Sequence, residues 1–151
     1  MASADYASEV KAQISGKLSN MNKSIKATSS ARICAVGAII AILIVTVLEF
    51  PPPIGFETRP QTGVSIFWLI FFLVIVITEI ATLPLIFKRP SLGLKFGIVA
   101  GILNILQVVA DQAHLMQPEI APLGYSALEG IVVLASLVLI YFSLKIQEDL
   151  P

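Results

Sequence analysis

One otherwise apolar stretch of the sequence holds four polar side chains at spacings of three, four and three residues: Asn104, Gln107, Asp111 and His114. Those spacings place all four on one face of a helix. Carboxyl, amide and imidazole groups on an apolar helix could bind a small polar molecule, pass protons or solutes along the helix, or hydrogen-bond to a neighbouring helix. The stretch therefore predicts a polar seam with three alternative uses.

Three further carboxyl groups lie in other apolar stretches: Glu49, Glu79 and Glu129. A short basic connection joins the stretch containing Glu79 to the seam, so antiparallel packing puts Glu79 level with residues 101–104. A bare carboxylate is costly at that depth in a membrane, and we expect Glu79 to be protonated or hydrogen-bonded, with Asn104 its nearest partner. Glu49 and Glu129 lie nearer the outer surface, where they would widen the seam into a pocket.

Other chemistry finds little support in the sequence. Cys34 is the only cysteine, which excludes an internal disulfide, and the single histidine cannot supply two axial ligands to a haem. The scattered carboxyl groups lack the clustered spacing of a metal site, and the chain has no P-loop, GxSxG or HExxH motif. We expect no catalytic residues and no metal or cofactor held by the chain itself, while a quinone or a lipid is a candidate ligand.

The hydropathy of the sequence predicts the helices that position these groups. Of the 151 residues 56% are apolar and 13% are charged, against about 25% charged in soluble domains. A membrane-spanning helix needs ~20 mostly apolar residues, and four stretches qualify, at about 33–50, 64–87, 92–112 and 123–144. Residues 64–77 contain a single polar side chain, Ser65, whereas a soluble helix would show a polar face. We predict an all-α polytopic membrane protein, with a four-transmembrane-helix bundle over residues 31–146 and a tail at 147–151.

The placement of cationic residues predicts the orientation of the bundle. They gather in the N-terminal segment, in the second connection and after the fourth stretch: Lys11, Lys17, Lys23, Lys26, Arg32, Lys88, Arg89, Lys95 and Lys145. The first connection carries only Arg59, and the third carries none. By the positive-inside rule both termini face the cytoplasm, and the loops at about 51–63 and 113–122 face the outer side.

The N-terminal segment, residues 1–30, carries apolar side chains at helical spacing: Val10, Ile14, Leu18, Met21 and Ile25. The lysines of the segment lie off this stripe. The pattern predicts an amphipathic helix that lies on the anionic inner leaflet or binds a partner.

Two glycines of the third stretch, Gly97 and Gly101, form a GxxxG pair on nearly the same stripe as the polar seam. A glycine pair at this spacing allows two helix backbones to approach closely. We therefore expect these residues at a helix–helix contact.

From the second apolar stretch to the end of the third, the chain resembles the DoxX-like family of small four-helix membrane proteins. The resemblance depends on the run 77–80 (Ile-Thr-Glu-Ile), the basic turn 88–90 (Lys-Arg-Pro) and the run 113–115 (Ala-His-Leu). It implies that Glu79 and His114 occupy positions that match those of the family. The family includes membrane subunits associated with quinone-linked sulfur oxidation, and many of its members work beside a partner enzyme.

These observations lead to three functional predictions. The first is an accessory, non-catalytic integral membrane subunit that packs against a larger membrane complex, such as a membrane oxidoreductase. The alternative is a protein that binds a quinone or lipid-like molecule in a polar pocket between Glu79 and His114, and the third is a proton or small-solute conduit. The expected partners are membrane lipids and other membrane subunits, because a net charge of zero provides no field that would attract nucleic acid.

Overall fold

The computed structural model of the chain describes residues 16, 29–60 and 63–148, and these residues form a four-helix bundle without strands. The helices are Ser29–Leu48, α2 (Ile66–Lys88), α3 (Pro90–Gln112) and α4 (Leu123–Glu148), each long and apolar enough to cross a membrane. The predicted all-α, four-helix membrane fold is confirmed. The predicted amphipathic helix and the end of the tail, at 1–15, 17–28 and 149–151, lie outside the described residues.

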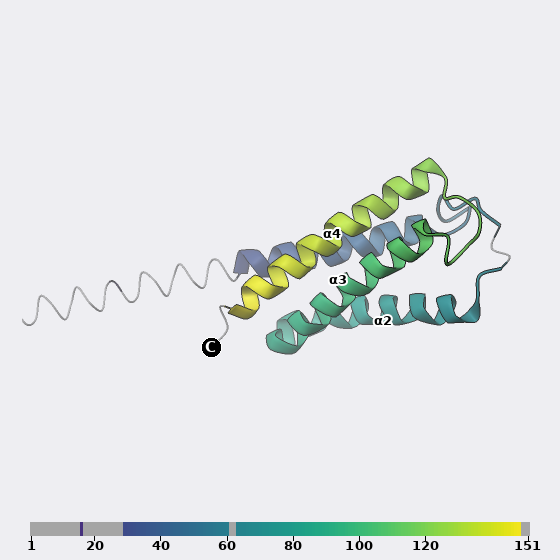
Figure 1. The fold of residues 1–151 in the computed structure, drawn as a ribbon. Helices are drawn as coiled ribbons and strands as arrows, with labels where there is room; N and C mark the ends of the chain where they lie inside the picture. Colours follow the sequence, from purple (N-terminus) through teal and green to yellow (C-terminus); the bar gives the residue numbers. More distant parts are fainter. Residues whose placement is uncertain (1–15, 17–28, 61–62, 149–151) are drawn as a thin grey trace, which may run out of the picture.

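The two ends of the bundle differ in construction. Figure 1 shows the start of the first helix, the turn between α2 and α3, and the C-terminal end of α4 together at one end. The longer connections, after the first helix and after α3, meet at the opposite end, which we call the loop end. Every helix therefore runs from one end of the bundle to the other, as the four predicted spans require.

The helix boundaries differ from the predicted spans by a few residues. The first helix begins four residues before the predicted start, because Ser29 to Arg32 extend it beyond its apolar part. At the other side it stops at Leu48, before the prolines. Pro90 is the first residue of α3, where its missing N–H costs nothing, so α2 and α3 are separated by Arg89 alone. The predicted start of this span at residue 92 was two residues late.

The helix α3 packs between α2 and α4. Two of its three glycines, Gly97 and Gly101, face α4: a Cβ on Gly97 would lie 2.8 Å from Ser143 Oγ, and a Cβ on Gly101 would lie 2.7 Å from Ile140 Cγ1. The absence of side chains at these two positions thus lets α3 and α4 approach closely. Gly97 and Gly101 therefore serve a helix–helix contact within this chain, and they do not lie on a surface that a partner protein could contact.

The outward face of the bundle is strongly apolar. On α2 the exposed side chains are mostly large and hydrophobic, among them Ile66, Phe67, Leu69, Ile70, Leu73 and Ile77. A continuous apolar surface of this kind is unfavourable in water, whereas lipid tails solvate it without cost. The burial pattern therefore agrees with a bundle that faces lipid.

Candidate functional site

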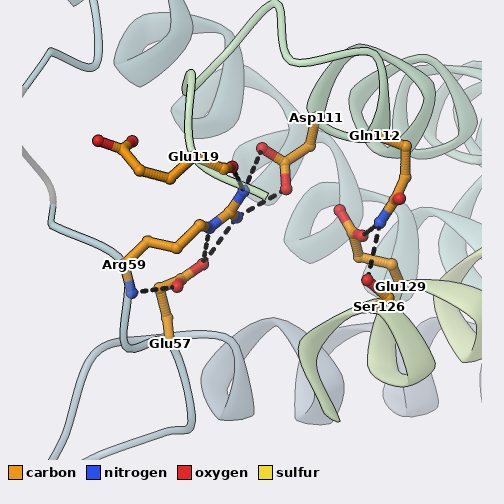
Figure 2. A network of polar contacts seen from close by, with 7 residues as sticks. All are labelled: Glu57, Arg59, Asp111, Gln112, Glu119, Ser126 and Glu129. Carbon is orange, nitrogen blue, oxygen red and sulfur yellow. Dashed lines mark hydrogen bonds and ion pairs between the residues drawn. The ribbon is translucent and has the colours of Figure 1, made fainter. Parts of the chain in front are cut away.

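A buried charge network occupies the loop end of the bundle. Arg59 Nη2 lies 2.7 Å from Glu57 Oε2 and 2.7 Å from Asp111 Oδ2, and the Arg59 guanidinium makes further hydrogen bonds to both carboxylates. The three residues are only 3–6% exposed. Figure 2 shows Arg59 reaching from its loop to Asp111 at the end of α3, with its Nη1 also donating to the Glu119 carbonyl oxygen at 3.4 Å. The network fastens the first loop to α3 and to the third loop.

The electrostatics of this network keep Arg59 charged. Burial alone would lower its pKa, but the hydrogen bonds and charges of Glu57 and Asp111 outweigh burial and raise the pKa above its ordinary value. The guanidinium carbon also lies 4.8 Å from the centre of the Tyr125 ring, a cation–π contact to α4. The Arg59 side chain thus contacts the carboxylates of Glu57 and Asp111 and the ring of Tyr125.

The backbone of the first loop explains how Glu57 and Arg59 reach these positions. The loop folds back on the end of the first helix, where Phe56 N donates to Leu48 O at 2.7 Å and Glu57 N donates to Phe50 O at 3.2 Å. Gly55 permits this fold, since a Cβ there would lie 2.2 Å from the carbonyl oxygens of Leu48 and Phe50. Carbonyl groups that the helix end leaves unpaired are satisfied by the loop that follows.

A second polar contact joins α3 to α4 beside the network. Gln112 Nε2 donates to Glu129 Oε2 and, at 3.1 Å, to Ser126 Oγ, as Figure 2 shows. Glu129 is 3% exposed, so this hydrogen bond helps to satisfy a buried carboxyl group. Gln112 was not among the predicted site residues, because it follows Asp111 directly and lies off the spacing of the seam.

Glu79 and Asn104 form a separate contact between α2 and α3. Asn104 Nδ2 donates to Glu79 Oε1 at 2.5 Å and to the Ala100 carbonyl oxygen at 3.0 Å. Glu79 is fully buried, and its Oε2 has no hydrogen-bond partner among the described residues. This is the contact expected from the antiparallel register of the two helices across their short turn.

A pocket of about 190 Å³ opens at the loop end, beside the charge network. It lies between the end of the first helix, α2, α3 and the two loops, and Tyr125 of α4 also reaches it. Its aromatic lining is Phe50, Trp68, Phe72 and Tyr125, and its carboxyl and amide lining is Glu49, Glu57, Gln107 and Gln117. Trp68 Nε1 also donates to Leu115 O at 3.0 Å, which connects α2 to the third loop.

Glu49 is the most unusual group in this lining. It lies in the turn directly after the first helix, and its Oε1 is buried without a hydrogen-bond partner among the described residues. Burial raises the pKa of Glu49 to about 8, and the neighbouring carboxyl groups add to the effect. Those neighbours are Glu129, Asp111, Glu57 and Glu79. A carboxyl group with this pKa is mostly protonated at pH 7.

The structure distributes the predicted site residues over several places. Gln107 lines the pocket, and Asp111 belongs to the charge network beside it. Neither Glu79 nor His114 lines the pocket. The helix α3 ends at Gln112, and His114 adopts a left-handed backbone conformation with φ 58° and an exposed side chain. The helical spacing that aligned His114 with the seam does not continue that far.

Several residues of the site were not predicted from the sequence. The sequence presents Arg59 only as a loop cation, and nothing in it distinguishes Glu57 from the rest of the loop at about 51–63. A Glu and an Arg two positions apart suggest a local ion pair, but their partner Asp111 is 52 residues away from Arg59. No sequence spacing connects them.

No group of three or more His, Cys, Asp or Glu residues in the described ranges is arranged to hold a metal ion. Comparison of the chain with protein-family models, with curated protein sequences and with solved structures gave no match. The DoxX-like resemblance stays a hypothesis from the sequence.

Proposed function

We propose that this chain is a membrane protein that binds one small amphipathic molecule in the pocket at the loop end. The observation that carries the proposal is the pocket itself, with aromatic walls and a buried carboxyl oxygen, Glu49 Oε1, that no described residue hydrogen-bonds. Binding sites for small molecules are typically concave and largely apolar, with a few polar groups that orient the ligand.

The volume of the pocket limits the size of the ligand. A dry cavity of roughly 150 Å³ can hold benzene. The pocket here, at about 190 Å³, therefore suits a molecule, or part of a molecule, about the size of one ring. Aromatic walls would contact its apolar body, and Glu49 and Gln107 would bond its polar group.

The charge network supports the proposal by holding the pocket walls in place. Glu57 contributes to the lining and is held by two hydrogen bonds from the Arg59 side chain. Arg59 is in turn anchored on α3 and on the third loop. A site whose walls are fixed before the ligand arrives loses less conformational entropy on binding.

The sidedness of the bundle is part of this proposal. The basic residues Lys88, Arg89 and Lys95 lie at or near the α2–α3 turn, away from the loop end. By the positive-inside rule the turn faces the cytoplasm and the pocket faces the outer side.

Blocking the pocket tests the proposal. We expect the chain, purified in mild detergent, to retain a small molecule that mass spectrometry of an organic extract identifies. In Gln107→Trp the larger side chain fills the pocket, and occupancy should fall by about tenfold or more, equivalent to ~1.4 kcal/mol of binding free energy. The matched control is Leu106→Trp on the same helix, at a side chain that is 52% exposed and outside the lining.

The control should keep its ligand and both variants should keep their helical content. An empty wild-type chain that also fails to bind any ring-sized probe would overturn the proposal, as would equal occupancy in the two variants. The accessory-subunit and conduit hypotheses stay predictions from the sequence, because the exposed apolar side chains of α2 suit lipid and a partner subunit equally.

A further inference from the structure

The charges in the pocket point to the class of ligand. No Lys, Arg or His is among the described residues that line it, whereas Glu49 and Glu57 are. Glu57 is already paired with Arg59, so its charge is compensated. Glu49 has no such partner in the described part of the chain, and its Oε1 has no hydrogen-bond donor there. Neither group offers a positive charge to an anionic ligand, whereas a cation would find an unused acceptor in Glu49.

The aromatic walls favour the same class. Phe50 and Phe72 meet edge to face with ring centroids 6.1 Å apart, and Trp68 and Tyr125 complete the aromatic lining. Ring faces attract ammonium groups, and aromatic cages are a recurrent way to bind organic cations. Tyr125 already takes the Arg59 guanidinium against its ring. A carboxyl group among aromatic rings is therefore a site for a protonated amine.

We propose that the pocket binds a small organic cation, a protonated amine with an apolar body about the size of one ring, and that Glu49 releases a proton when the amine binds. This inference rests on the proposed function, since it names the ligand class of the same pocket. In the empty pocket Glu49 carries its proton; on binding, that proton leaves for water, and the carboxylate forms an ion pair with the R–NH₃⁺ group. No covalent bond other than the carboxyl O–H breaks, and the charge inside the pocket stays the same.

The groups around Glu49 determine how this exchange depends on pH. The titratable and charged groups that act on it, or lie beside those that do, come from the first loop, α2, α3 and α4: Glu57, Arg59, Glu79, Asp111, Tyr125 and Glu129. Arg59 compensates Glu57 and Asp111, so burial of Glu49 is the main cause of its raised pKa of about 8. Below that pH each bound amine must displace one proton. Affinity should therefore rise about tenfold per pH unit between pH 6 and 7 and level off near pH 8.

Two probes of equal shape and different charge test the ligand class on the full chain in detergent. Benzylamine is protonated over this pH range, and benzyl alcohol is its neutral counterpart. We expect benzylamine to bind at pH 7.5 at least about tenfold more tightly than benzyl alcohol, and less tightly at pH 6. Calorimetry in buffers of different ionisation enthalpy should show the release of about one proton per bound amine at pH 7.

A matched pair of variants isolates Glu49. Glu49→Gln should weaken amine binding at pH 7.5 by about tenfold or more and abolish its pH dependence, while benzyl alcohol binding stays unchanged. Glu119→Gln removes a carboxyl group at the same end of the bundle that does not line the pocket, and it keeps the backbone carbonyl oxygen that accepts from Arg59, so it should behave as the wild type. The calorimetric proton count uses the wild-type chain alone, so the inference stays testable even if Glu49→Gln does not fold.

The possible outcomes separate the two proposals. Equal binding of both probes, without proton release, would overturn the cation inference and leave the pocket as a binding site. If Gln107→Trp blocks a neutral molecule and benzylamine does not bind, the inference also fails and the proposed function stands. Failure of both probes and of every extract to show a ligand would overturn both.

Discussion

Two polar regions of this bundle are constructed in opposite ways. The contact in the α2–α3 hairpin is one side-chain hydrogen bond, from Asn104 to Glu79, between helices that are consecutive in the chain. At the loop end, Arg59 joins its own loop to α3, to the third loop and to a ring of α4. The first region could be removed without disturbing the path of the chain. The second decides where two loops lie, and one of its carboxylates, Glu57, lines the pocket.

The largest difference between the regions should appear on removing Arg59. Arg59→Ala leaves Glu57 and Asp111 buried without their counter-ion, and breaking such a pair costs about 3–5 kcal/mol of unfolding free energy. Denaturation in mixed micelles, followed by circular dichroism, measures it. Arg89→Ala, at the exposed turn between α2 and α3, is the control and should change stability by about 0.5 kcal/mol or less. Equal effects of the two changes would mean that the network does not stabilise the loop end.

An intermediate effect is expected at the close contact between α3 and α4. A leucine at Gly101 would meet Ile140 and the Ser136 carbonyl oxygen, with the Cβ already 2.7 and 3.0 Å from them. Overpacking of this kind costs about 1–3 kcal/mol, so Gly101→Leu should unfold at a lower denaturant concentration. Gly130→Leu is the matched control on α4, because a Cβ there meets nothing within 4 Å. A Gly101 variant as stable as the control would place α3 and α4 further apart than described.

The smallest effect should come from the hairpin contact. Glu79→Gln keeps an oxygen that can accept from Asn104, and we expect it to fold with a change of about 0.6 kcal/mol or less. Glu79→Ala removes the acceptor, and the lost hydrogen bond should add about 0.6–1.7 kcal/mol to its cost. The same denaturation measurement ranks the two variants. If either exceeded Arg59→Ala, the ordering of the two regions would be reversed.

The sequence was informative wherever short-range patterns decide the structure. Four apolar stretches require four helices, because a backbone in hydrocarbon must satisfy its own hydrogen bonds. The short α2–α3 connection then determines the antiparallel register, which is why Glu79 could be matched to Asn104 from residue spacing alone. The glycines Gly97 and Gly101 were likewise recognisable, although the helix they face, α4, was not.

The loop end lay beyond such reasoning. The helical periodicity predicted that the polar seam extends to His114. In the structure α3 ends at Gln112, and His114 has a positive φ and lies outside the helix. Glu49 and Gln107 were singled out as polar groups in apolar surroundings, whereas nothing in their spacing showed that both would line one pocket with Trp68 and Tyr125. Arg59 looked like an ordinary loop cation.

The sequence by itself therefore determined that the chain spans a membrane and that it has four helices. It also determined the contact between the two helices that the shortest turn joins. These depend on hydropathy and on periodicity, which act over a few residues to a few turns. Only the tertiary structure decided that Arg59 is buried between Glu57 and Asp111, and that Glu49 lines a cavity where no described residue hydrogen-bonds its Oε1. Both features depend on how the first and third loops fold over the loop end of the bundle. The closing contact joins residues 52 positions apart through charges whose strength comes from burial, and burial is a property of the assembled bundle.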